Sequence, residues 1–87
     1  MEATIYKHDI NFRVRNIANQ KILLGNGEAF QLNETGYLIW ESIDGTKDLK
    51  TILGIIMDSY ESTEEVAKND LINFINFLLE IKAIKEV

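Results

Sequence analysis

The sequence predicts an α+β fold in which a three-stranded antiparallel sheet precedes three helices. Between Phe12 and Leu32 the apolar residues recur at the short spacing that is typical of strands, and after Asn33 they recur at intervals of three and four, as in helices. No proline, internal repeat or low-complexity segment divides the 87 residues. We therefore expect one domain over residues 1–87, which is close to the usual size of a domain.

The strands are expected within residues 12–32, joined by two tight turns. Ala18-Asn19 separates the first pair, and Gly25-Asn26-Gly27 separates the second. The second turn contains residues that tolerate the positive φ of a hairpin. This pattern predicts a meander whose third strand spans Glu28–Leu32.

The first two helices are predicted from their end signals. Asn33 has a side-chain acceptor for the first turn of a helix over residues 34–43, and Asp44-Gly45 ends that helix because glycine adopts the left-handed conformation easily. A second helix is expected over residues 48–60, where the carboxylate of Asp48 suits the N-terminal dipole.

The third helix is expected over residues 63–81, because Ser62 and Glu65 have the spacing of a capping box. At 100° per residue its apolar side chains cover an arc of about 220°, whereas a surface helix typically needs little more than 100°. Two flanks widen the core stripe, Ile72 with Leu79 on one side and Val66 with Phe77 on the other. Such a surplus of apolar surface is typical of a contact surface.

The residues that could carry chemistry do not form a catalytic pattern. The chain has no cysteine and a single histidine, His8, which we expect to be a solvated side chain. The carboxylates fall at helix starts and exposed faces, where dipole and solubility explain them. Trp40 is expected in the core. We therefore predict that the protein is not an enzyme and holds no metal ion or cofactor.

The charge distribution argues against nucleic acid as a partner. Residues 1–32 carry four basic and three acidic side chains (+1), and residues 33–87 carry five basic and eleven acidic ones (−6). The second part of the chain would repel a phosphate backbone. No secretion signal or membrane-spanning run is visible, so we expect a cytoplasmic protein without a membrane partner.

Several short segments resemble one known family over roughly residues 12–84. They are Leu23-Leu24-Gly25 with Gly27, Phe30-Gln31-Leu32-Asn33-Glu34-Thr35-Gly36, Ile39-Trp40-Glu41, Asp44-Gly45-Thr46, Asp70-Leu71 and Phe77-Leu78. These segments look like those of the PqqD-like family, the recognition elements for precursor peptides of ribosomally synthesised natural products. The end of the chain departs from the family pattern, since Lys82-Ala83-Ile84 replaces a common glycine-leucine ending.

The resemblance implies a winged helix-turn-helix-like fold and a peptide-binding function. In this family the leader segment of a precursor peptide pairs as an added strand with the third strand and lies against the third helix. We therefore expect peptide contacts at Glu28, Ala29, Phe30, Gln31, Leu32, Ile72, Ile75, Phe77 and Leu79. The implied partner is a separate modifying enzyme, either a radical-SAM maturase or the leader peptidase of a lasso-peptide system.

Two other functions remain open from sequence alone. A small sheet with three helices also occurs in winged-helix DNA-binding regulators. Alternatively, the apolar flanks of the third helix are covered by a second copy in a homodimer. Arg13 and Arg15 project from one side of the first strand, where they meet either solvent or an acidic leader.

Overall fold

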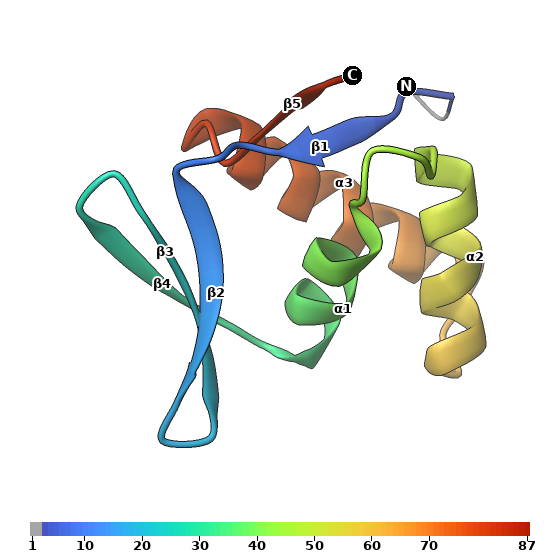
Figure 1. The fold of residues 1–87 in the computed structure, drawn as a ribbon. Coiled ribbons are helices and arrows are strands. Elements are labelled where there is room, and N and C mark those ends of the chain that lie inside the picture. The colour runs from blue at the N-terminus through green and yellow to red at the C-terminus, as the bar shows by residue number, and fades with distance from the viewer. Residues whose placement is uncertain (1–2) are drawn as a thin grey trace.

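Three antiparallel strands form the sheet that the sequence predicts: β2 (Phe12–Ile17), β3 (Gln20–Gly25) and β4 (Glu28–Leu32). They are seen in a computed structural model that describes residues 3–87 (Figure 1). Three helices follow the sheet: α1 (Glu34–Ser42), α2 (Leu49–Ser59) and α3 (Glu64–Glu80). The predicted α+β class and the order of sheet and helices are therefore confirmed.

Both hairpins close through two-residue turns with positive φ. Ala18 and Asn19 have φ of 52° and 66°, and Asn26 and Gly27 have φ of 51° and 79°. Left-handed residues at both central positions define a turn whose twist matches that of the flanking strands. The turns therefore fix the register of the whole sheet, with Gly25 opposite Glu28 beside the second turn.

The first helix begins at Glu34 as the sequence indicates, whereas the second begins at Leu49, one residue later than expected, with Asp48 as its N-cap and not in its first turn. The side-chain oxygen of Asn33 accepts a hydrogen bond from the backbone N–H of Gly36 (2.7 Å), and that of Asp48 accepts one from Thr51 (2.8 Å). Each bond satisfies an N–H that has no partner within the helix.

The capping box predicted for the third helix is wrong by one residue. Thr63, not Ser62, is the N-cap of α3, and its hydroxyl accepts from the N–H of Val66 (3.3 Å). Because Val66 occupies the position where a capping box has Glu or Gln, the reciprocal bond is missing. The backbone N–H of Ser62 donates instead to the carbonyl oxygen of Tyr60 (2.8 Å).

Two short strands at the ends of the chain were not predicted. β1 (Tyr6–His8) pairs antiparallel with β5 (Ile84–Glu86) in a separate two-stranded ribbon, with Tyr6 opposite Glu86. Figure 1 shows this ribbon beside α3, apart from the three-stranded sheet. Tyr6 and Ile84 are buried, so the ribbon contributes to the core.

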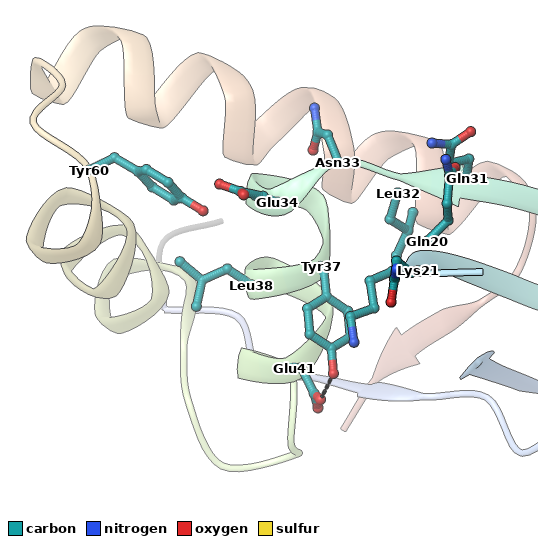
Figure 2. Close-up of a pocket in the computed structure, with 11 residues that line it drawn as sticks. Gln20, Lys21, Gln31, Leu32, Asn33, Glu34, Tyr37, Leu38, Glu41 and Tyr60 are labelled. Carbon is teal, nitrogen blue, oxygen red and sulfur yellow. Dashed lines mark hydrogen bonds between the residues drawn. The ribbon is translucent and has the colours of Figure 1, made fainter. Parts of the chain in front are cut away.

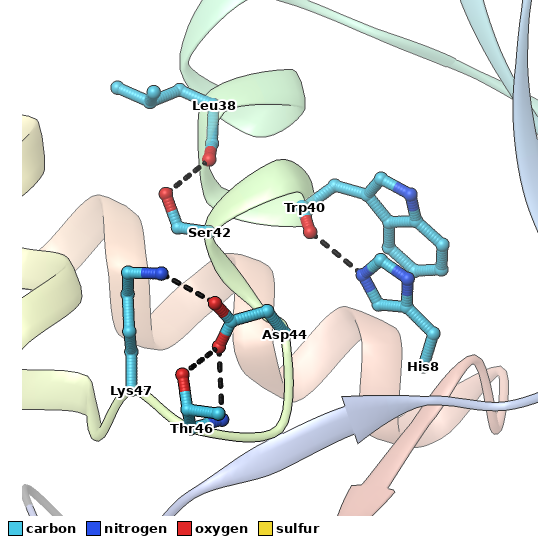
Figure 3. A network of polar contacts seen from close by, with 7 residues as sticks. All are labelled: His8, Leu38, Trp40, Ser42, Asp44, Thr46 and Lys47. Carbon is cyan, nitrogen blue, oxygen red and sulfur yellow. Dashed lines mark hydrogen bonds and ion pairs between the residues drawn. The ribbon is translucent and has the colours of Figure 1, made fainter.

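His8 links the ribbon to α1, contrary to the expectation of a solvated side chain. Its ring stacks on Trp40 with 3.7 Å between the ring centroids, and Nε2 donates to the Trp40 carbonyl oxygen at 2.7 Å (Figure 3). Trp40 is 4% exposed, which confirms its predicted place in the core. This contact cannot be predicted from local sequence, because the two residues are 32 positions apart.

α3 ends where the chain departs from the family's glycine-leucine pattern. Lys82 has a φ of 64°. Its N–H donates to the carbonyl oxygen of Leu79 (3.1 Å), and the N–H of Ala83 donates to the carbonyl oxygen of Leu78 (2.9 Å). These two bonds form a Schellman motif, which normally places glycine at the left-handed position. Lysine there is strained, because its Cβ approaches the backbone carbonyl.

Replacing Lys82 with glycine is expected to stabilise the protein by about 0.5–1 kcal/mol. The left-handed strain of about 1–2 kcal/mol disappears, and the greater flexibility of glycine in the unfolded chain offsets part of the gain. Thermal unfolding should therefore shift upward by several degrees. Lys82→Ala, which removes the charge and keeps the Cβ, is the control; an equal rise in that variant would contradict the explanation.

The core joins the sheet to all three helices. Its most buried large side chains come from β3, α1, the loop after α1, α2 and α3: Leu23, Ile39, Ile43, Ile52, Ile56, Ile75 and Leu78. Gly36 of α1 lies so close to α3 that a Cβ there would stand 3.3 Å from the Phe74 ring. This close approach places the start of α1 against the middle of α3, next to the end of β4.

Candidate functional site

The outer side of β4 is an open sheet edge. The strand order is β2-β3-β4, and within residues 3–87 no strand pairs with β4 on the side away from β3. The chain's additional strands, β1 and β5, pair with each other and leave this edge free. An unpaired row of N–H and C=O groups is a template for another extended chain.

The register identifies which main-chain groups of β4 face the open side. In a two-residue hairpin the residues next to the turn are hydrogen-bonded to each other, and bonded and non-bonded pairs alternate along the ladder. Counting from the Gly25↔Glu28 pair, every second residue of β4 bonds to β3. The N–H and C=O groups of Ala29 and Gln31 therefore point outward.

An aromatic cluster connects β4 to α3. The rings of Phe30 and Phe77 meet edge to face with centroids 5.2 Å apart, and those of Phe74 and Phe77 lie 6.0 Å apart. All three side chains are only partly buried. Together they form an apolar wall beside the open edge of β4, and we call Phe30, Phe74 and Phe77 the aromatic wall.

A cleft with a volume of about 340 Å³ continues this wall past the end of β4. It lies between the first turn of α1 and the middle of α3. Its lining residues are Asn33, Thr35, Gly36, Ile39, Asp70, Asn73, Phe74 and Phe77. We call this space the α1–α3 cleft; of its residues, only Phe77 is among the peptide contacts expected from the sequence.

Only one flank of α3 faces the cleft. At 100° per residue, Leu79 and Ile72 lie about 140–160° around the helix from Phe77, so they point away from the cleft that Phe77 lines. Ile75 is fully buried and Leu32 nearly so, at 0% and 7% exposure. These two residues lie beneath the site. The proposed contact surface therefore keeps Glu28, Ala29, Phe30 and Gln31 of β4 and the flank of α3 that carries Phe77.

Arg13 and Arg15 lie too far from β4 to pair with a strand added there. Both belong to β2, two strands away from β4. At about 4.8 Å per strand, an added chain would run about 14 Å from β2. The structure therefore gives no support to a contact between these arginines and the paired part of a leader.

A second cleft, of about 560 Å³, lies on the other side of the β4–α1 connection (Figure 2). Lys21 lies over the ring of Tyr37, 4.8 Å from its centroid, and the hydroxyl of Tyr37 donates to the carboxylate of Glu41. That hydrogen bond, together with desolvation and the charge of Glu41, raises the pKa of Tyr37. Lys21, Tyr37 and Glu41 therefore interact with one another within this second cleft.

The described residues offer no metal site and no membrane span. Within residues 3–87 no three His, Cys, Asp or Glu side chains are grouped so that they could hold a metal ion.

None of the three helices in this range has the length and apolar character required to cross a membrane. The carboxylate of Asp44 already has partners within the protein. Lys47 and Thr46 donate hydrogen bonds to it, and these bonds lower the pKa of Asp44.

An open strand edge beside an aromatic wall defines a site suited to an extended chain, and comparison with known proteins agrees with this description. The sequence pattern of the family described as coenzyme PQQ synthesis protein D (PqqD) matches residues 20–84, which is 65 of the 87 residues. The chain belongs to the PqqD family, and the resemblance seen in the sequence is confirmed.

A solved structure shares the fold. TbiB1, determined in complex with the TbiA(beta) leader peptide, superposes with a TM-score of 0.79 and is 22% identical. The match covers 91% of this chain and 94% of that chain. At this identity the similarity shows a common fold. No curated protein matches the chain.

Proposed function

We propose that the protein binds the leader segment of a ribosomally synthesised precursor peptide and presents it to a separate modifying enzyme. The observation that carries this proposal is the unpaired edge of β4 next to the aromatic wall. Main-chain bonds to Ala29 and Gln31 supply affinity that does not depend on sequence, and the wall selects apolar side chains. Membership of the PqqD family and the leader-bound TbiB1 structure support the same function.

The protein acts as a recognition element in this proposal, with no chemical step of its own. The enzyme that it serves is a radical-SAM maturase or a leader peptidase, and it works where the precursor is made, in the cytoplasm. DNA binding gains no support from α3, because four acidic residues outnumber one lysine within Glu64–Glu80. A helix that enters a DNA groove needs more basic than acidic side chains, because it lies against the phosphate backbone.

Truncation of Phe77 tests the proposal. We expect Phe77→Ala to weaken binding of the leader by about 30-fold, the effect of losing an anchor worth about 2 kcal/mol. Leu79→Ala is the matched control, because Leu79 is also partly buried but lies on the opposite flank of α3. Isothermal titration calorimetry with a synthetic leader peptide that binds the unmodified chain measures both affinities.

The two variants separate a binding effect from a folding effect. Both should unfold at lower temperature than the unmodified chain, since each loses partly buried apolar surface. Only Phe77→Ala should also lose leader affinity. Equal affinity losses in both variants, or no loss in Phe77→Ala, would contradict the position of the site.

A further inference from the structure

The α1–α3 cleft contains polar side chains that the fold itself does not use. Thr35, Asp70 and Asn73 line the cleft, and among residues 3–87 none of them forms a side-chain hydrogen bond or ion pair. Beneath them lie the rings of Phe74 and Phe77. An apolar floor with a few convergent polar groups is the usual composition of a ligand site.

The cleft lies in line with the open edge of β4. Asn33, the residue that follows β4, is part of its lining. The sheet is antiparallel throughout, and antiparallel pairing is slightly more stable per residue. A peptide that continues this pattern on β4 runs from the Leu32 end toward the Glu28 end. The residues that precede its paired segment therefore enter the α1–α3 cleft.

The charge in the cleft has one sign. Asp70 is the sole charged residue of the lining, and no lysine or arginine is present there. The surrounding chain strengthens this field, because residues 33–87 carry a net charge of −6 from five basic and eleven acidic side chains. A cationic side chain is therefore favoured both by the local carboxylate and by the wider potential.

We infer that the α1–α3 cleft selects a lysine or arginine in the leader, on the N-terminal side of the segment that pairs with β4. Asp70 is the counter-charge, and Asn73 and Thr35 bind the neighbouring main chain. This inference rests on the proposed function and adds the class of leader that the protein accepts. Since Asp70 is exposed, its pairing strengthens binding by up to about fivefold, and high salt weakens this contribution.

Selection of a displayed library of random linear peptides on the immobilised full-length chain tests the inference. Enriched peptides should combine a segment of alternating apolar residues with a lysine or arginine that precedes it. Selection on Asp70→Asn should remove the basic preference, and selection on Asp70→Lys should replace it with aspartate or glutamate. Asp58→Asn, an exposed change on α2 outside the cleft, is the matched control and should keep the basic preference.

The outcomes separate this inference from the proposed function. An alternating segment without a basic residue, or with one that follows it, would overturn the inference and leave strand addition intact. A basic preference that persists in Asp70→Asn would also overturn it. If no alternating segment is enriched, the proposed function fails, and the inference fails with it.

Discussion

Replacing Ala29 with proline is expected to abolish leader binding while leaving the fold intact. The N–H of Ala29 points to the open side of β4, so proline there removes no bond to β3. Proline is tolerated on an edge strand when its N–H position faces solvent. Its ring, however, blocks the approach of a further strand. The loss of about three ladder bonds at about 1 kcal/mol each corresponds to at least 100-fold weaker binding.

The opposite edge of the sheet provides the control for this variant. Counting from the Ile17↔Gln20 pair beside the first turn, the N–H of Asn16 points away from β3. Asn16→Pro therefore makes the same change on β2 and should leave leader affinity unchanged. Fluorescence anisotropy with a labelled leader compares the two variants, and circular dichroism checks the fold. If Asn16→Pro alone loses binding, the leader pairs with β2 and not with β4.

Gly25→Ala should destabilise the protein by about 2–3 kcal/mol. The ring of Phe12 covers Gly25 so closely that a Cβ there would lie 2.3 Å from one ring carbon. Either the ring or the hairpin must shift, and overpacking of this kind typically costs about 1–3 kcal/mol. For a chain of this size we expect the midpoint of thermal unfolding to fall by about 10–20 °C.

Gly54→Ala is the matched control, because no atom outside its chain neighbours and the surrounding backbone of α2 lies within 4 Å of the position that a Cβ would occupy there. Gly54 is exposed within α2, where alanine is the better helix former by about 1 kcal/mol. Differential scanning calorimetry should therefore show opposite shifts for the two glycine substitutions. A similar shift in both would mean that the contact with Phe12 does not limit position 25.

The sequence predicts much of this fold because its signals are local. Asn33 and Asp48 each cap a helix by accepting a hydrogen bond from the N–H three residues later. Each hairpin turn depends on two adjacent residues with positive φ. The sequences of β1 and β5 contain no such local signal. Each strand has three residues, too few for a pattern, and each finds its partner at the other end of the chain.

The candidate site is predicted less completely, because its geometry depends on tertiary packing. The breadth of the apolar surface of α3 is visible in the sequence, but the flank that faces β4 depends on how the helix is rotated against the sheet. Phe77 and Leu79 are equivalent until that rotation is known. The outward amides of Ala29 and Gln31 likewise follow from the register, since a shift of one residue exchanges the two sides.

The ribbon at the chain ends also determines where attachments can be made. Since Tyr6 lies opposite Glu86, a group attached at the outer end of either strand would lie close to the outer end of the other strand. A label or solid support attached beside Tyr6 or beside Glu86 would therefore occupy the same region of the surface. Removing either strand, by contrast, would leave the other without its ladder partner, because within residues 3–87 β1 and β5 pair only with each other.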